Sequence, residues 1–182
     1  MKGRSSSVPE KKPVPAAVHV ALLGLLAALA IIMGYIEARI PLPLPVPGIK
    51  LGLCNIVIVF ALYELGFWRA LLISLVRVVV IGLLFSGPIS IFYALGGALL
   101  SLIGMELLRR SGRFSVPAVS AAGGALHSIG QILVAAVLTG GTGIFRYLPV
   151  LLLTGEFCGL VIGLVDRIIL HRLKRYKNQW II

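Results

Sequence analysis

Six apolar runs constrain this chain more than any other feature of its sequence. They cover residues 14–36, 51–65, 70–85, 89–108, 116–138 and 147–170. A helix of about 20 apolar residues is long enough to cross a lipid bilayer. Hydrophobic residues make up 59% of the 182 residues and charged residues 13%, whereas soluble domains carry about 25% charged residues. The sequence therefore predicts an all-α membrane protein, a single bundle of six transmembrane helices.

The positive charges lie mainly in the short segments that flank these runs. The formal net charge is +11, but no basic face for nucleic acid remains once the helices are in lipid. With six spans, one side of the membrane collects most Lys and Arg residues, and the other side holds Arg39, Lys50 and Arg146. Cytoplasmic segments carry such an excess. We therefore expect both termini in the cytoplasm, with basic tails at 1–13 and 171–182 around a membrane domain at 14–170.

A small group of polar side chains inside the apolar runs predicts a binding site. By the helical rise they lie roughly 8–17 Å below the outer ends of their helices, whereas Asp166 is expected at the inner interface. A polar group in hydrocarbon needs a partner or water. The clustering predicts an outward-opening polar pocket for a solute, lined by Asn55, Arg77, His127, Gln131 and Glu156.

Two pairs within this group also have purely structural interpretations. Arg77 and Glu156 have opposite charges at similar depth, so they either pair and staple the bundle or line the pocket. His127 and Gln131 are four residues apart and share a helix face. Hydrogen bonding between helices is the alternative to ligand binding for this second pair.

A proline-rich segment at 41–47 joins the first two runs. Its alternating prolines exclude a helix and favour polyproline II. The segment is either an inert connector or a lid over the pocket. Lys50, just after it, is placed to attract an anionic solute.

Small residues recur at intervals of four in the first run, as Ala17 with Ala21 and Gly24 with Ala28. Such spacing allows two helices to approach closely. The pattern predicts either packing within the bundle or docking onto a partner membrane protein.

Signatures of catalysis are missing from the sequence. It has no P-loop and no serine or cysteine triad. Its six carboxylates include no paired aspartates of the kind that bind Mg²⁺ and diphosphates. The two cysteines, Cys54 and Cys158, are interpreted as small buried hydrophobic residues. We therefore expect neither a cofactor nor a metal, and a non-enzymatic function is favoured over an enzymatic one.

Three segments together resemble a known family. They are Val46-Pro-Gly-Ile-Lys-Leu-Gly-Leu-Cys-Asn55, Ala125-Leu-His-Ser-Ile-Gly-Gln131 and Tyr147-Leu-Pro-Val-Leu-Leu-Leu-Thr-Gly155. The chain resembles the bacterial Gx transporter family, also catalogued as heptaprenyl diphosphate synthase component I. That family is similar to the substrate-binding S components of energy-coupling factor (ECF) transporters, which are six-helix proteins of the cell membrane. This likeness implies docking through Ala17, Ala21, Gly24 and Ala28 onto a transmembrane coupling protein driven by ATPases.

Three functions remain open from the sequence. The first is a solute-binding component of an uptake transporter, with the solute held by the pocket residues and Lys50. The second is a membrane subunit associated with isoprenoid, heptaprenyl diphosphate or quinone synthesis. The third is a structural scaffold for a redox complex.

Overall fold

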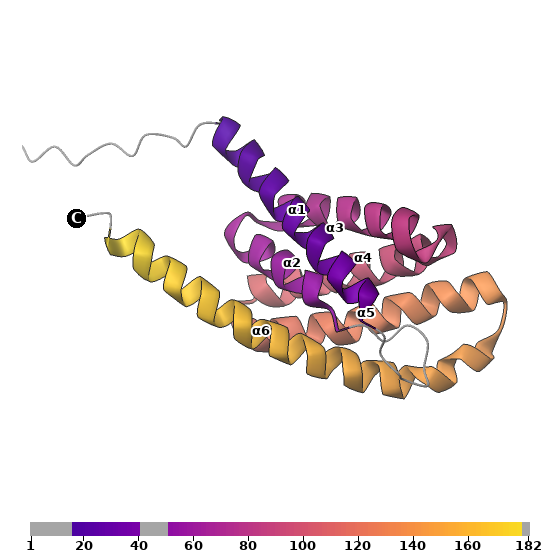
Figure 1. Cartoon of the computed structure of the whole chain (residues 1–182). Helices are drawn as coiled ribbons and strands as arrows, with labels where there is room; N and C mark the ends of the chain where they lie inside the picture. Colours follow the sequence, from indigo (N-terminus) through magenta and orange to yellow (C-terminus); the bar gives the residue numbers. More distant parts are fainter. Residues whose placement is uncertain (1–15, 41–50, 180–182) are drawn as a thin grey trace, which may run out of the picture.

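The computed structural model describes residues 16–40 and 51–179, and within them the chain is built from helices alone. This confirms the all-α prediction. An additional π-helical turn, η1 (Gly82–Ser86), extends the third helix, and a 3₁₀ helix, η2 (Thr142–Tyr147), precedes the sixth. The six main helices, shown in Figure 1, are α1 (Ala16–Arg39), α2 (Leu53–Glu64), α3 (Phe67–Ile81), α4 (Pro88–Arg110), α5 (Val116–Thr139) and α6 (Leu148–Gln179).

Five of the helices are long and apolar enough to cross a membrane, which makes this a multi-pass membrane protein. The second predicted span, at 51–65, is the exception. Its helix α2 has 12 residues and is about 18 Å long at 1.5 Å per residue, whereas the hydrocarbon core is about 30 Å thick. The prediction of six spans is therefore confirmed only for five of them.

The helices start and stop close to residues that favour helix ends. Pro88 and Pro117 lie in the first turns of α4 and α5, where proline is well tolerated. Gly140, with φ of 64°, ends α5 in a left-handed conformation that glycine adopts without a steric penalty. At the other end of the chain, α6 continues to Gln179, so much of the predicted tail at 171–182 is helical.

Both chain-end helices point to one end of the bundle. The first turn of α1 and the last turns of α6 lie at the same end, on the left of Figure 1, and the α5–α6 connection lies at the opposite end. We call these the inner and the outer end, following the predicted orientation. α1 packs against α2 and α3, whereas α5 packs most extensively against α4 and α6.

The α5–α6 contact depends on glycine. A Cβ atom on Gly124 of α5 would overlap the backbone carbonyl of Gly155 on α6, and a Cβ on Gly155 would meet Ser128 Oγ and the Gly124 carbonyl. The two backbones therefore touch at this level. Ser128 Oγ also donates a hydrogen bond of 2.9 Å to the carbonyl of Leu151 across the same interface.

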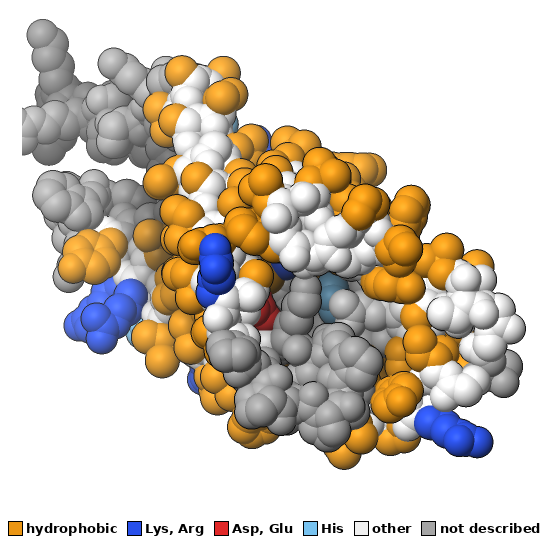
Figure 2. Space-filling model, turned by 45° about the vertical axis from the view of Figure 1, so that its right-hand side comes forward, with side chains coloured by type: hydrophobic (Ala, Val, Ile, Leu, Met, Phe, Trp, Pro, Cys, Tyr) orange, Lys and Arg blue, Asp and Glu red, His pale blue; other side chains and the backbone are white. Residues whose placement is uncertain are grey.

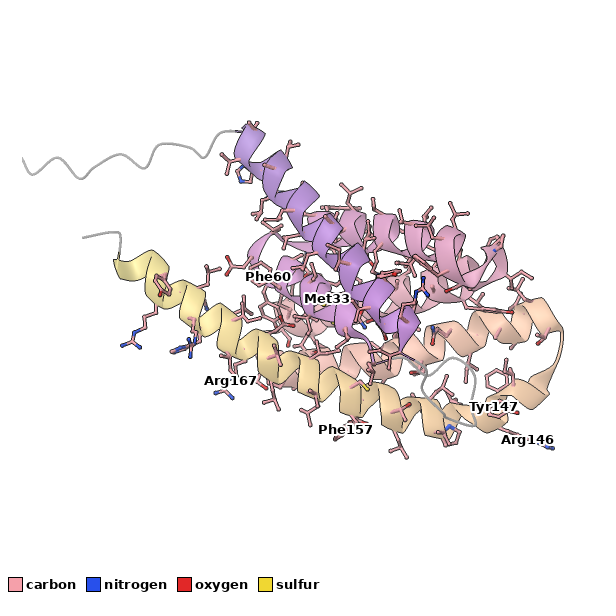
Figure 3. The ribbon with its side chains drawn as sticks, viewed as in Figure 1. Met33, Phe60, Arg146, Tyr147, Phe157 and Arg167 are labelled. Carbon is pink, nitrogen blue, oxygen red and sulfur yellow. The ribbon has the colours of Figure 1, made fainter. Side chains whose placement is uncertain are left out.

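Large apolar side chains cover the outside of the bundle. Phe157 on α6 is 67% exposed and Leu153 is 70% exposed, and Figure 3 shows Phe157 pointing away from the other helices. Little of the apolar face of α1 is buried either. Such a surface suits contact with lipid chains rather than water.

Candidate functional site

A single cavity is lined by side chains from all six helices. It encloses about 740 Å³ of atom-free space, its open mouth included. Figure 2 shows acidic and histidine atoms recessed in a hollow between apolar side chains. The polar lining residues are Glu37, Cys54, Asn55, Arg77, Ser101, Ser120, His127, Ser128, Gln131, Thr154 and Cys158.

The structure brings four of the predicted site residues to this cavity. Asn55 comes from α2, Arg77 from α3, and His127 and Gln131 from α5. Both α5 side chains pack against Gly97 of α4, where a Cβ would lie 2.9 Å from His127 Cε1 and 2.9 Å from Gln131 Cγ. The absence of a side chain at Gly97 therefore gives this pair its place in the cavity wall.

Glu156, by contrast, does not line the cavity. It lies on the exposed face of α6, while its neighbour Gly155 faces inward. No ion pair joins Glu156 to Arg77, both of which are described residues, whereas Glu106 pairs with Arg109 and Arg110. The structural interpretation that Arg77 pairs with Glu156 is therefore wrong. Lys50 and the proline-rich segment lie outside the described residues.

Glu37, which directly follows the first apolar run, supplies the carboxylate of the cavity instead. It is buried at 8% exposure on the inward face of α1, which also carries Ala30 and Gly34. Its Oε1 accepts a hydrogen bond of 2.5 Å from the backbone N–H of Gly52 at the start of α2. A carboxylate at this position also interacts favourably with the positive end of the α2 dipole.

Cys54 links this carboxylate to the cationic side chain. Its thiol lies 3.7 Å from Glu37 Oε2, and Arg77 Nη1 donates a hydrogen bond to its sulfur. Cys54 is buried, as predicted, but it takes part in a polar chain and is not simply a small hydrophobic residue. Arg77 Nη1 is used in this bond, and its buried Nε has no acceptor among the described residues. The guanidinium therefore keeps unused donor capacity.

The spacing of the inward-facing residues of α1 could have identified Glu37 as a cavity residue from the sequence. Ala30, Gly34 and Glu37 follow one another at intervals of four and three residues, which places them on one helix face. Two small residues on that face indicate a close approach to other helices, and the carboxylate continues the same face. Thr154, one helical turn from Cys158 on α6, also lines the cavity and was not predicted from the sequence.

The four predicted docking residues lie on the surface of α1. Ala17, Ala21, Gly24 and Ala28 are all exposed, and a Cβ on Gly24 would meet no atom within 4 Å. Packing within the bundle, the alternative drawn from the sequence, therefore does not explain their spacing.

The cavity offers the chemistry of binding. Its described walls provide one guanidinium, one carboxylate, one imidazole, two amides and several hydroxyls. Among the described residues, no three His, Cys, Asp or Glu side chains come together in a way that could hold a metal ion. The arrangement suits a small polar molecule that carries both donors and acceptors.

Together, the helices and the cavity define a small multi-pass membrane protein with an internal polar site. The chain matches one protein family over residues 26–169, which covers most of its length. It belongs to the family described as heptaprenyl diphosphate synthase component I, as its sequence motifs indicated. No curated protein and no solved structure matches the chain.

Proposed function

We propose that the protein is the membrane-embedded solute-binding component of an uptake transporter in a bacterial cell membrane. The observation that supports this most is the convergence of Asn55, Arg77, His127 and Gln131 on one cavity. Polar side chains inside a membrane bundle commonly mark a solute path. The solute enters from the outer end and contacts residues of all six helices.

The side chains of the cavity favour an anionic or zwitterionic solute. Arg77 has donors to spare, and a guanidinium binds a carboxylate or phosphate through paired hydrogen bonds. One oxygen of Glu37 accepts a hydrogen bond from the Gly52 N–H. In this proposal the carboxylate also binds the positive group of a zwitterionic solute. The amides of Asn55 and Gln131 supply both donors and acceptors. Lys50, two residues before Gly52 in the sequence, adds a second cation to the proposed site.

Energy for uptake comes from other proteins in this proposal, because the sequence has no P-loop. The exposed small residues on α1 provide the docking surface for a transmembrane coupling protein that carries the ATPases. Small residues let a partner helix approach closely in lipid. An S-component-like fold and cytoplasmic termini belong to the same proposal.

Binding to the purified protein tests this function. A panel of small anionic and zwitterionic solutes is screened by thermal stabilisation in detergent, and any hit is quantified by calorimetry. We expect Arg77→Ala and His127→Ala each to weaken binding by at least tenfold, or about 1.4 kcal/mol. Glu156→Gln is the matched control on the exposed face and should bind as the wild type does. Unchanged affinity in both cavity variants would place the solute elsewhere.

The family description favours a second function, that of a membrane subunit of a heptaprenyl diphosphate synthase. In this case a partner protein carries the catalytic residues, because the present sequence holds one aspartate, Asp166, and no Asp-rich motif. Purification of the tagged protein in mild detergent separates the two functions. Recovery of a prenyl synthase supports the second, and recovery of a coupling protein with ATPases supports the first.

A further inference from the structure

A buried carboxyl group lies beyond the cavity, toward the inner end of the bundle. Asp166 on α6 is fully buried, with 0% exposure, although its sequence position predicted an interfacial side chain. Neither of its two carboxyl oxygens has a hydrogen-bond partner in the described ranges 16–40 and 51–179. The large majority of buried polar side chains in proteins have at least one, so this group requires an explanation.

Among the described residues, no cation packed against Asp166 neutralises it. α5 and α2 are the helices that α6 contacts most. The one titratable residue of α5 is His127, which lies in the cavity wall. On α2, Tyr63 is close enough to interact electrostatically with Asp166 and with Arg109 of α4. Arg109 is already bound to Glu106.

The other titratable groups near Asp166 lie further along α2 or on α6 itself. Glu64 follows Tyr63 at the inner end of α2 and is partly exposed. Arg167 is the next residue of α6, and its side chain points away from the bundle in Figure 3. Leu170, one turn further on the face of Asp166, is buried and apolar. Within the part of the chain that the structure describes, the immediate surroundings of the carboxyl group therefore contain no counter-ion.

An ionised carboxylate in such a place is costly, because its charge is removed from water with no counter-ion or donor in exchange. We propose that Asp166 is a proton-binding site, separate from the solute cavity, and that it carries a proton in the state described by the structure. The proposal does not depend on the nature of the solute. It assigns a ligand, the proton, to a residue that the cavity does not use.

Asp166 lies close to the cavity, so the proposed proton site and the solute site are near each other. Ile162 lies four residues earlier on the same face of α6 and lines the cavity, so about one helical turn, or 6 Å, separates the two. On the inner side, Tyr63 lies under the Arg109 guanidinium, with 5.9 Å from Arg109 Cζ to the ring centre. A shift of α6 or α2 that opens this region to water makes ionisation favourable.

The composition of the chain offers a direct test, because Asp166 is its one aspartate. Protein made with aspartate labelled at the carboxyl carbon is reconstituted in liposomes and examined by infrared spectroscopy, where the isotope shift isolates this carboxyl group. At neutral pH we expect the labelled carbonyl band of a neutral acid. Raising the pH should convert it fully and reversibly to the labelled carboxylate bands.

Two variants exclude other sources of the signal. The band should be absent from Asp166→Asn, which keeps the shape of the neutral acid, and unchanged in Glu156→Gln. A carboxylate spectrum at neutral pH would overturn the proposal. So would a neutral-acid band that persists throughout the alkaline range in which the protein stays folded, because the proton would then never be released. Since the wild-type spectrum alone gives either answer, the test stands even if Asp166→Asn does not fold.

Discussion

Glu37 at the end of α1 accepts a hydrogen bond of 2.5 Å from the backbone N–H of Gly52 at the start of α2. Gly52 has φ of 75°, a conformation that other residues adopt only with strain. The contact therefore joins the end of α1 to the start of α2, and the Glu37 carboxylate lies with Cys54 and Arg77 in the cavity wall.

Replacing Glu37 tests this contact. We expect Glu37→Ala to lower the free energy of unfolding by about 1–3 kcal/mol, because the Gly52 N–H loses its acceptor in a partly buried place. Glu37→Gln keeps an oxygen acceptor and should lose less. Denaturant unfolding in detergent measures both. Glu156→Ala, an exposed glutamate changed in the same way, is the control, and an equal loss there would show that the Gly52 contact is not responsible.

The contact between Gly124 and Gly155 predicts a severe effect from a single methyl group. Gly124→Ala forces α5 and α6 apart, and overpacking of this kind typically costs about 1–3 kcal/mol, occasionally more. Gly24→Ala on α1 is the matched control, since a methyl group there meets no atom within 4 Å and should be neutral or slightly stabilising. Thermal unfolding of the two variants compares them. If they melt together, the helices are not in backbone contact.

Cys158 provides a way to block the cavity without mutation. It lines the cavity and is partly exposed, whereas Cys54 is buried at 2% exposure. Alkylation with a bulky maleimide should modify Cys158 first and reduce solute binding by more than tenfold. Mass spectrometry locates the adduct. Treatment of Cys158→Ser with the same maleimide shows whether the loss of binding requires modification of Cys158. Full binding by fully modified protein would remove Cys158 from the site.

The exposed small residues of α1 predict a variant that folds normally but loses its partner. Gly24→Leu adds bulk on the open side of the helix, so the free energy of unfolding should change little. Recovery of the partner from mild detergent should fall at least tenfold. Leu25→Ala, at a neighbouring exposed position, is the control for a general change of the α1 surface. Undiminished recovery with Gly24→Leu would assign docking to another helix.

The sequence predicted the helices well because a bilayer imposes a minimum length and polarity on each of them. It overestimated α2, since the apolar run at 51–65 does not reveal that its helix begins only at Leu53 and ends at Glu64. The family was likewise evident from short motifs, among them the segment that ends at Asn55 and the one that carries His127 and Gln131.

The apolar runs predicted which helix carries each candidate site residue, but not which way its side chain faces around that helix. Arg77, His127 and Gln131 reach the cavity, whereas Glu156 at a similar depth lies on the exposed face. Which face of α6 turns inward is set by Gly155 and Gly159, whose missing side chains admit α5. That preference depends on the neighbouring helix and therefore cannot be read from α6 alone. For the same reason, the burial of Asp166 could not be predicted from the sequence.

The hydrogen bond between Glu37 and Gly52 joins residues that are 15 positions apart, so α1 is attached to the start of α2 by a contact as well as by the covalent chain. A protease cut between these two residues would therefore leave α1 held in the bundle by its packing against α2 and α3. The nicked protein should therefore migrate as one particle in detergent and separate into two fragments only after denaturation.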